Sequence, residues 1–112
     1  MEDDLLGGHI QELRRGTVVL ACLSILKQPG YGYGLLEELE RAGFGVEANT
    51  LYPLLRRLEK QGLLTSSWDT EEARPRKFYT TSEQGAELLN ALLQDWEALH
   101  TSIRQLNEGQ PS

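Results

Sequence analysis

The sequence predicts a mainly α-helical protein with one small β-hairpin, and three observations support this fold class. First, residues 49–63 place leucines at the spacing i, i+3, i+4, i+7, which forms one apolar side of a helix. Second, the pattern changes after Gly62 to two short alternating stretches, 63–69 and 77–81, joined by a polar segment that ends at Pro75. Third, apolar residues recur every three or four positions through the C-terminal part of the chain.

The composition indicates one small domain in a reducing compartment. The chain has 112 residues, which is enough for a single small core. Cys22 is the only cysteine, so no internal disulfide can form, and its apolar surroundings favour a buried structural role over a reactive thiol. The longest apolar run, 18–23, is too short to cross a bilayer, and residues 1–4 are acidic where a signal peptide would be basic. We therefore expect a cytoplasmic location without membrane attachment.

The charge is distributed unevenly along the chain. The formal net charge of −6 argues against a nucleic-acid partner when it is taken as a whole. However, residues 1–50 carry −4, residues 51–80 carry +2 and residues 81–112 carry −4. One modest positive patch per chain predicts weak DNA binding by a monomer and useful binding only by a dimer.

The N-terminal part predicts one long helix after a flexible start. Residues 1–9 contain two adjacent glycines and little apolar periodicity, so we expect them to be flexible, as we do residues 109–112 at the other end. The pattern is helical over 10–27, ends at Pro29, and is apolar on nearly every side from residue 18. Such a helix must be covered on every side, and we infer that a second subunit covers part of it, with Leu20 in the contact.

Residues 31–41 predict a second, shorter helix with leucines inward and glutamates largely outward. It opens with the sequence YGYG, which we interpret as a tight turn, because no phosphate-loop motif accompanies it. Residues 43–48 connect this helix to the helix at 49–63. Two short helices joined by a glycine-containing turn are typical of a helix–turn–helix.

The helix at 49–63 has an unusual outer side. We place Thr50 as its N-cap and Pro53 as its third helical residue, because proline is tolerated only in the first turn. Its positive dipole end would then suit an anion such as a phosphate. The side opposite the leucines carries an aromatic residue, a proline and two cations, which are Tyr52, Pro53, Arg56 and Lys60. Our hypothesis is that this is a DNA recognition helix.

The hairpin that follows completes the predicted domain. Its tip and returning strand carry three cations, Arg74, Arg76 and Lys77. A helix–turn–helix followed by a basic hairpin is a winged helix, with the hairpin as a second contact to phosphate or the minor groove. We therefore predict a winged helix–turn–helix DNA-binding domain over residues 10–82.

Residues 83–108 predict a C-terminal dimerisation helix that begins after Ser82, its N-cap. Residues spaced by three and four form a heptad seam along it, which is Leu89, Leu92, Trp96, Leu99, Ile103 and Leu106. The alternative is a helix packed on its own domain. We favour a dimer seam packed with the first helix, because Leu88 and Leu93 already supply an inward stripe.

No arrangement of residues predicts an enzyme. We see no catalytic constellation and no cofactor fingerprint. His9 and His100 have no partners at ligand spacing, so we expect no metal site. We expect Tyr33 and Tyr79 to be packed rather than to contact phosphate.

Five stretches together resemble PadR-type transcriptional regulators of the short subfamily with one C-terminal helix. They are RRGTVVLACLSIL at 14–26, YGYGLLEEL at 31–39, NTLYPLLRRLEKQGLL at 49–64, RPRKFYTTSEQG at 74–85 and LLQDWEAL at 92–99. The resemblance implies a homodimeric winged-helix repressor that dimerises through its first and last helices, binds a palindromic operator and often responds to a small effector.

The resemblance also implies roles for single residues. Thr50, Tyr52, Pro53 and Arg56 match the DNA-facing helix, and Arg76 and Lys77 match the wing. Two positions depart from the family pattern. Asn49 stands where the family usually has glycine, and since asparagine tolerates positive φ, we expect the turn and its DNA-facing position to be kept. The wing tip, 69–73, holds three acids where glycine is usual, which should weaken its contact with phosphate, above all at Arg74.

Trp96 has two interpretations. In some regulators similar to this chain, a tryptophan of the last helix lines a pore at the dimer interface and stacks on planar aromatic drugs. The favoured interpretation is simpler, namely that Trp96 is a large residue of the seam.

The function that the sequence predicts is a homodimeric, sequence-specific DNA-binding regulator, most simply a repressor, with a candidate effector site at Trp96. The alternative is a winged-helix protein–protein interaction module, which the overall acidity and the acidic wing tip favour. The salt dependence of binding separates the two.

Overall fold

The computed structural model describes residues 1–71 and 73–108. Over these ranges the chain forms five helices and three strands. In chain order they are α1 (Asp3–Arg15), α2 (Val18–Ile25), β1 (Gly30–Tyr31), α3 (Gly32–Arg41), α4 (Ala48–Lys60), β2 (Leu64–Asp69), β3 (Arg76–Thr81) and α5 (Glu83–Glu108). This order confirms the predicted fold class. The predicted flexible end at 109–112 lies outside the described residues.

The strands form one antiparallel sheet in the order β1-β3-β2. β2 and β3 pair along their whole length, from Leu64 opposite Thr81 to Asp69 opposite Arg76. β1 adds two residues on the other side of β3. The hairpin of β2 and β3 was predicted, whereas β1 was not, because two residues are too few to show an alternating pattern.

One core lies between α2, α3, α4, the base of the sheet and the start of α5. Its buried apolar side chains are Cys22, Leu23, Leu26, Leu35, Leu39, Leu51, Leu55, Leu58, Leu63, Leu64, Tyr79 and Leu89. The predicted inner stripe of α4 is confirmed for three leucines, while Leu54 is only half buried. Burial raises the pKa of the Cys22 thiol to about 12, so the thiol stays protonated and fills space as predicted.

The N-terminal helix differs from its prediction in two ways. It begins at Asp3, although residues 1–9 were expected to be flexible because of Gly7 and Gly8. The carboxylates of Asp3 and Asp4 lie at the positive end of the helix dipole and stabilise the helix there. It also ends at Arg15, and α2 starts afresh at Val18, so 10–27 is not one helix. No residue of α1 is buried, so the helix contributes no side chain to the core.

Ser82 caps α5 as predicted. The backbone N–H of Gly85 donates to Ser82 Oγ over 3.0 Å, and the hydroxyl itself donates to the carbonyl of Gly62 over 2.6 Å. This cap therefore fixes the start of α5 against the turn that ends α4.

Gly85 is expected to tolerate no side chain, because α5 crosses the chain at Leu63 there. A Cβ at Gly85 would lie 2.1 Å from the backbone oxygen of Leu63. We expect Gly85→Ala to lower the free energy of unfolding by about 1–3 kcal/mol, as overpacking usually does. Urea unfolding measures it. The control Gly34→Ala, in α3 with nothing within 4 Å of the new Cβ, should be neutral or stabilising. Equal stability of the two variants would contradict the close crossing.

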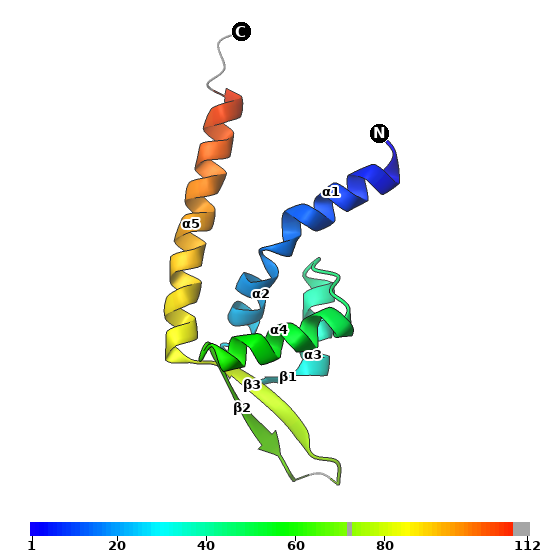
Figure 1. Ribbon diagram of the computed structural model, residues 1–112, viewed down its shortest axis with the longest axis vertical. Coiled ribbons are helices and arrows are strands. Elements are labelled where there is room, and N and C mark those ends of the chain that lie inside the picture. Colours follow the sequence, from blue (N-terminus) through cyan, green and yellow to red (C-terminus); the bar gives the residue numbers. More distant parts are fainter. Residues whose placement is uncertain (72, 109–112) are drawn as a thin grey trace.

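Two helices project from the same side of the domain. Figure 1 shows α1 and α5 extending upward with space between them, while the hairpin of β2 and β3 extends the opposite way. The molecule is accordingly elongated, with extents of 65 × 34 × 20 Å. Within residues 1–71 and 73–108, the structure has no helix with the length and apolar character that crossing a membrane requires.

Candidate nucleic-acid interface

Helix α4 presents one polar side to solvent. Asn49, Pro53, Arg56 and Lys60 are all exposed, and their helical positions put them together on the side away from the buried leucines. Arg56 and Lys60, four residues apart, are neighbours on that side. The structure therefore brings four of the predicted DNA-binding residues together as expected.

The start of α4 corrects two predictions. Glu47 is the N-cap, and its carbonyl accepts the backbone N–H groups of Thr50 and Leu51 over 3.0 and 2.9 Å. Thr50 is thus the third helical residue rather than the cap, and Pro53 is the sixth rather than the third. Because Pro53 has no N–H, the carbonyl of Asn49 lacks its usual helical donor on the exposed side. A polar group of another molecule could bond there.

Asn49 does not replace a positive-φ glycine. Its φ is negative and it lies in the first turn of α4, so the expectation that it preserves a left-handed turn is wrong. The positive φ of this connection is at Gly43, at 93°. The turn therefore ends α3 rather than starting α4.

Tyr52 is less exposed than predicted. It is half buried, and its ring packs on α3, where a Cβ at Gly32 would lie 2.4 Å from the ring. The missing side chain of Gly32 makes room for the ring. Tyr52 thus lies on the flank of α4 and not opposite the leucines.

Lys77 is turned toward the protein. Its Nζ lies 3.1 Å from Glu59 Oε1, and both side chains are about one-third exposed, at 31% and 32%. The second oxygen of Glu59 accepts a hydrogen bond from the hydroxyl of Ser66. That bond and the Lys77 ammonium lower the pKa of Glu59, while Glu59 raises the pKa of Lys77. Its charge therefore links the wing to α4 in the single chain, and its predicted contact with phosphate stays a prediction.

We expect the Glu59 link to stabilise the fold at neutral pH and not in acid. Glu59→Gln should lower the free energy of unfolding by about 1 kcal/mol at pH 7. Because folding lowers the pKa of Glu59, its contribution is complete above its ordinary pKa of 4.5 and is lost as pH falls through the folded value. Urea unfolding from pH 7 to pH 3 should therefore show the difference between the wild type and the variant shrinking. The exposed Glu37→Gln is the control, and a difference independent of pH would contradict the assignment.

The other face of the wing holds a second cation. The guanidinium carbon of Arg76 lies 4.0 Å from the centre of the Tyr31 ring, a cation–π contact. The hydroxyl of Tyr31 donates to Asp69 Oδ2 over 2.6 Å, and this bond lowers the pKa of Asp69. Arg76 itself is exposed. It therefore keeps a surface position, as predicted, while the bond from Tyr31 to Asp69 links β1 to the end of β2 beside the wing tip.

The wing tip is exposed and of mixed charge. Arg74 is exposed there, as is Glu71, whose backbone N–H donates to Asp69 Oδ1 over 3.1 Å. Glu72, the third predicted acid, lies outside the described residues. The expectation that acids weaken contact at Arg74 stays a prediction.

Three exposed residues near this surface were missed or misjudged. Tyr33 on α3 is 70% exposed although it was expected to be packed, whereas Tyr79 is buried as expected. Trp68 on β2 is 62% exposed. Arg57 lies on the flank of α4 toward α1. Periodicity says on which side of an element a residue lies, but not where the neighbouring elements leave that side open.

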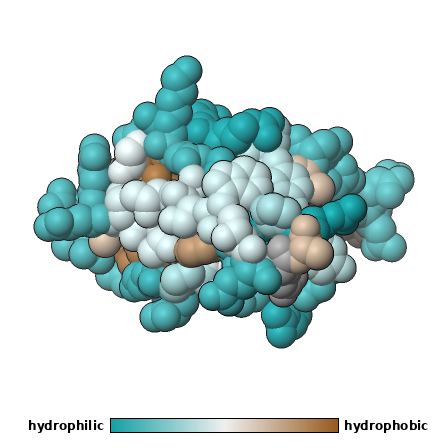
Figure 2. Space-filling view, turned by 90° about the horizontal axis from the view of Figure 1, so that it is seen from below, coloured by the Kyte–Doolittle hydropathy of each residue, from teal (hydrophilic) through white to brown (hydrophobic). Residues whose placement is uncertain are grey.

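The surface at the wing end is polar. Seen from that end in Figure 2, hydrophilic groups surround a pale band of intermediate hydropathy, and the hydrophobic areas are small and separate. An apolar protein-docking patch would appear as one continuous hydrophobic area. This face therefore suits a polar partner.

The predicted dimer seam is exposed only over its C-terminal part. Leu89 is completely buried in its own chain, so its assignment to the interface is wrong, and Leu88 rather than Leu93 accompanies it inward. Leu92 and Leu20 are half buried. The remaining seam residues are between 48% and 65% exposed, namely Trp96, Leu99, Ile103 and Leu106. The single chain thus leaves an apolar stripe of α5 uncovered.

Helix α1 leaves a second apolar stripe uncovered. Leu6, Ile10 and Leu13 are exposed and are spaced by four and three residues, so they lie on one side of the helix. The helices that carry the two stripes, α1 and α5, project from the same side of the domain (Figure 1).

Trp96 lines a pocket between α5, α2 and the end of α1. The pocket has a volume of about 510 Å³ and includes Leu20, Leu93 and Leu13. The indole ring is stacked on His100, with 6.2 Å between centroids and 18° between planes. In the described part of the chain no group of histidines, cysteines and carboxylates could hold a metal ion.

Comparisons with known proteins identify the family of this chain. Residues 19–91 match the transcriptional regulator PadR-like family. The transcriptional regulator Rv3488 of Mycobacterium tuberculosis is 39% identical over 80 residues, which are 71% of this chain and 72% of that protein. The crystal structure of a PadR family transcriptional regulator from Eggerthella lenta superposes with a TM-score of 0.92 and 45% identity, over 96% of each chain.

A further solved structure is Bacillus subtilis PadR in complex with operator DNA. It superposes with a TM-score of 0.62 and 21% identity, over 68% of this chain and 46% of that one. At this identity the likeness shows the fold alone. From the family match and its relatives, the chain belongs to the PadR-like family of transcriptional regulators, which are not enzymes.

Proposed function

We propose that the protein is a homodimeric repressor that binds a specific DNA operator through α4 and its wing. The observation that carries the proposal is the exposed side of α4, where Arg56 and Lys60 stand away from the core in a chain that is otherwise acidic. Bacillus subtilis PadR, which shares the fold, has been captured with operator DNA, and this supports the same role for the winged helix here. In this proposal residues 10–82 bind DNA.

The bases and the backbone would be contacted by different parts of the site. The long side chain of Arg56 can bond a base edge in the major groove, and Lys60 can reach a phosphate. The carbonyl of Asn49, left without its helical donor by Pro53, adds an acceptor on the same exposed side. Arg76 on the wing lies over Tyr31 and can contact the backbone.

The dimer would form along the uncovered stripes of α1 and α5. Residues 83–108 then act as the dimerisation helix, with Leu99, Ile103 and Leu106 against the second copy. Two α4 helices would enter successive major grooves about 34 Å apart, so a palindromic operator is expected. Since the positive charge per chain is small, both copies are needed for useful affinity.

A small planar aromatic effector at Trp96 completes the proposal. Trp96 is 48% exposed and lines an apolar pocket that would lie next to the dimer seam. Titration of planar aromatic cations against the fluorescence of Trp96, with Trp68→Phe to remove the other emitter, tests this role. Saturable quenching of Trp96 by a ligand of this class would support it, and no quenching by any ligand of the class would refute it.

Selection of bound fragments from the source genome tests DNA binding and names the operator. The affinity of the protein for this operator should then fall steeply as the salt concentration rises, because binding releases counterions from the phosphates. The alternative, a protein–protein interaction module, predicts no selected fragment and little effect of salt. The polar surface at the wing end favours DNA over that alternative (Figure 2).

A further inference from the structure

We propose that Trp68 is a further DNA-contacting residue, whose indole ring packs on a deoxyribose of the strand that passes between α4 and the wing. The inference rests on the proposed function and adds an apolar contact to it. Trp68 is 62% exposed on β2. Within residues 1–71 and 73–108, its ring makes no hydrogen bond, stacking or cation–π contact. A large aromatic ring left in water is typical of a surface that a partner covers.

The face of the hairpin that carries Trp68 is turned toward α4. Side chains alternate along a strand, so Ser66 and Trp68, two residues apart on β2, lie on the same face. The hydroxyl of Ser66 donates to Glu59 of α4. Lys77 lies directly opposite Trp68 on β3, and its Nζ also reaches Glu59. This face therefore forms the inner side of the angle between α4 and the hairpin, which Figure 1 shows.

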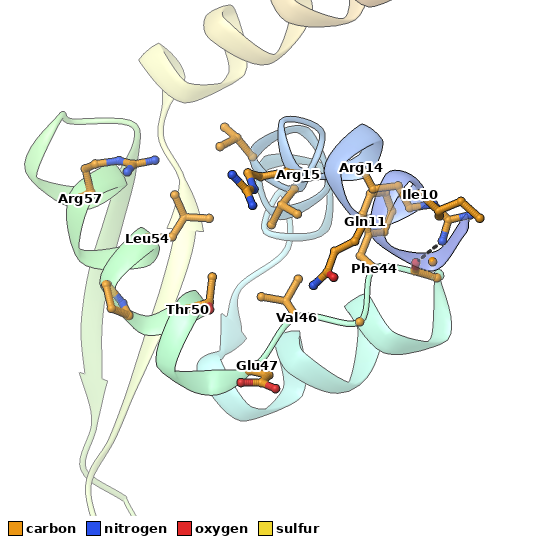
Figure 3. Close-up of a pocket in the computed structure, with 16 residues that line it drawn as sticks. Ile10, Gln11, Arg14, Arg15, Phe44, Val46, Glu47, Thr50, Leu54 and Arg57 are labelled. Atoms are coloured by element: carbon orange, nitrogen blue, oxygen red, sulfur yellow. Dashed lines mark hydrogen bonds between the residues drawn. The ribbon is translucent and has the colours of Figure 1, made fainter. Parts of the chain in front are cut away.

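The exposed side of α4 continues onto this face of the wing. On one flank of the helix, Leu54 and Arg57 are turned into a pocket between α4 and α1 (Figure 3). On the other flank lies Glu59, three residues after Arg56 and hence its neighbour on the helix surface. Glu59 contacts the wing, so a continuous surface leads from Arg56 to Trp68. DNA that lies against Arg56 therefore meets the face that carries Trp68.

A DNA strand fits this angle in its chemistry. With α4 in the major groove and the wing over the neighbouring minor groove, the strand between the two grooves passes through the angle. Arg56 and Lys60 supply cations for its phosphates, and Trp68 supplies an apolar surface for a sugar between them. The ion pair with Lys77 offsets the charge of Glu59, so this acid repels the strand less.

The test measures the affinity of the full chain for the selected operator by fluorescence anisotropy at several salt concentrations. We expect Trp68→Ala to weaken binding at least about tenfold, because each copy in the dimer loses one apolar contact. The factor should be the same at every salt concentration, since no charge is removed. Trp68→Phe should recover part of the affinity. The control Thr65→Ala, exposed on the opposite face of β2, should change nothing.

Tryptophan emission gives a second readout of the contact. The chain has two tryptophans, so the emission of Trp68 is the difference between the wild type and Trp68→Phe. Saturating operator should shift this emission to shorter wavelength, because the ring leaves water. Strong quenching together with a loss of base preference in Trp68→Ala would indicate stacking on a base, and it would overturn the sugar contact.

Two further results would overturn the role of Trp68. Unchanged operator affinity in Trp68→Ala would mean that DNA does not cover the ring. A loss of affinity with a smaller salt slope would mean that the substitution disturbs the cations of the wing, which is a structural role. A wild type that binds no DNA would refute the proposed function as well. If the wild type binds its operator and neither readout responds to Trp68, only the contact of Trp68 is refuted.

Discussion

Arg56→Ala is expected to weaken operator binding by roughly 2–6 kcal/mol. Arg56 is exposed on the side of α4 that faces away from the core, and a specific arginine–base contact contributes about 1–3 kcal/mol. The loss counts twice because each copy in the dimer contributes one α4. Fluorescence anisotropy with the selected operator and with scrambled DNA measures both affinity and base preference.

The control separates the effect of losing a charge on α4 from the effect of changing the net charge of the protein. Arg104→Ala removes the same charge from α5, where Arg104 pairs with Glu108 over 2.9 Å, far along the helix from the wing. It should leave operator affinity within about 0.5 kcal/mol. Arg56→Ala should also reduce base preference, because the contact that it removes is to a base edge. Equal effects of the two substitutions would mean that α4 does not read the operator.

The sequence predicted those elements that repeat a pattern over several residues. The leucine spacing of 49–63 identified α4 and its buried side, and the alternation before and after the polar tip identified the hairpin. By contrast, β1 has two residues and lies in the sheet only because β3 is beside it. The sequence analysis also placed the start of α4 too late, because it assumed that Pro53 must lie in the first turn. A proline in the sixth helical position is unusual because it removes one helical hydrogen bond. The loss is tolerated here because the carbonyl of Asn49, which loses its donor, lies on the exposed side of the helix.

The roles of single side chains depended on contacts between distant residues. Lys77 was predicted as a phosphate contact from its place on the wing, but Glu59, 18 residues earlier, pairs with it. Tyr52 was predicted on the outer side of α4, yet Gly32 opens a space for its ring on α3. No local pattern contains either pairing. The same limit applies to Arg57, whose flank faces a pocket only because α1 crosses nearby.

Leu99→Asp is expected to separate the dimer. Leu99 is 55% exposed in the single chain, at the middle of the uncovered stripe of α5. In the proposed dimer a charge there would be buried near its symmetry mate, at a cost of about 4 kcal/mol or more, which is roughly a thousandfold weaker dimerisation. The monomer should keep its fold, because Leu99 contributes nothing to the core. Sedimentation equilibrium and urea unfolding measure the two effects separately.

The matched control is Gln94→Asp, an exposed residue of α5 on the side opposite Leu99. It adds the same charge and should leave the dimer intact. Operator affinity should follow dimerisation, because one chain carries too little positive charge to hold DNA at moderate salt. If Leu99→Asp stays dimeric, the copies meet elsewhere. If it becomes monomeric and still binds the operator as tightly, a single α4 with its wing is sufficient for binding. The small positive charge of one chain would then not limit its affinity for DNA.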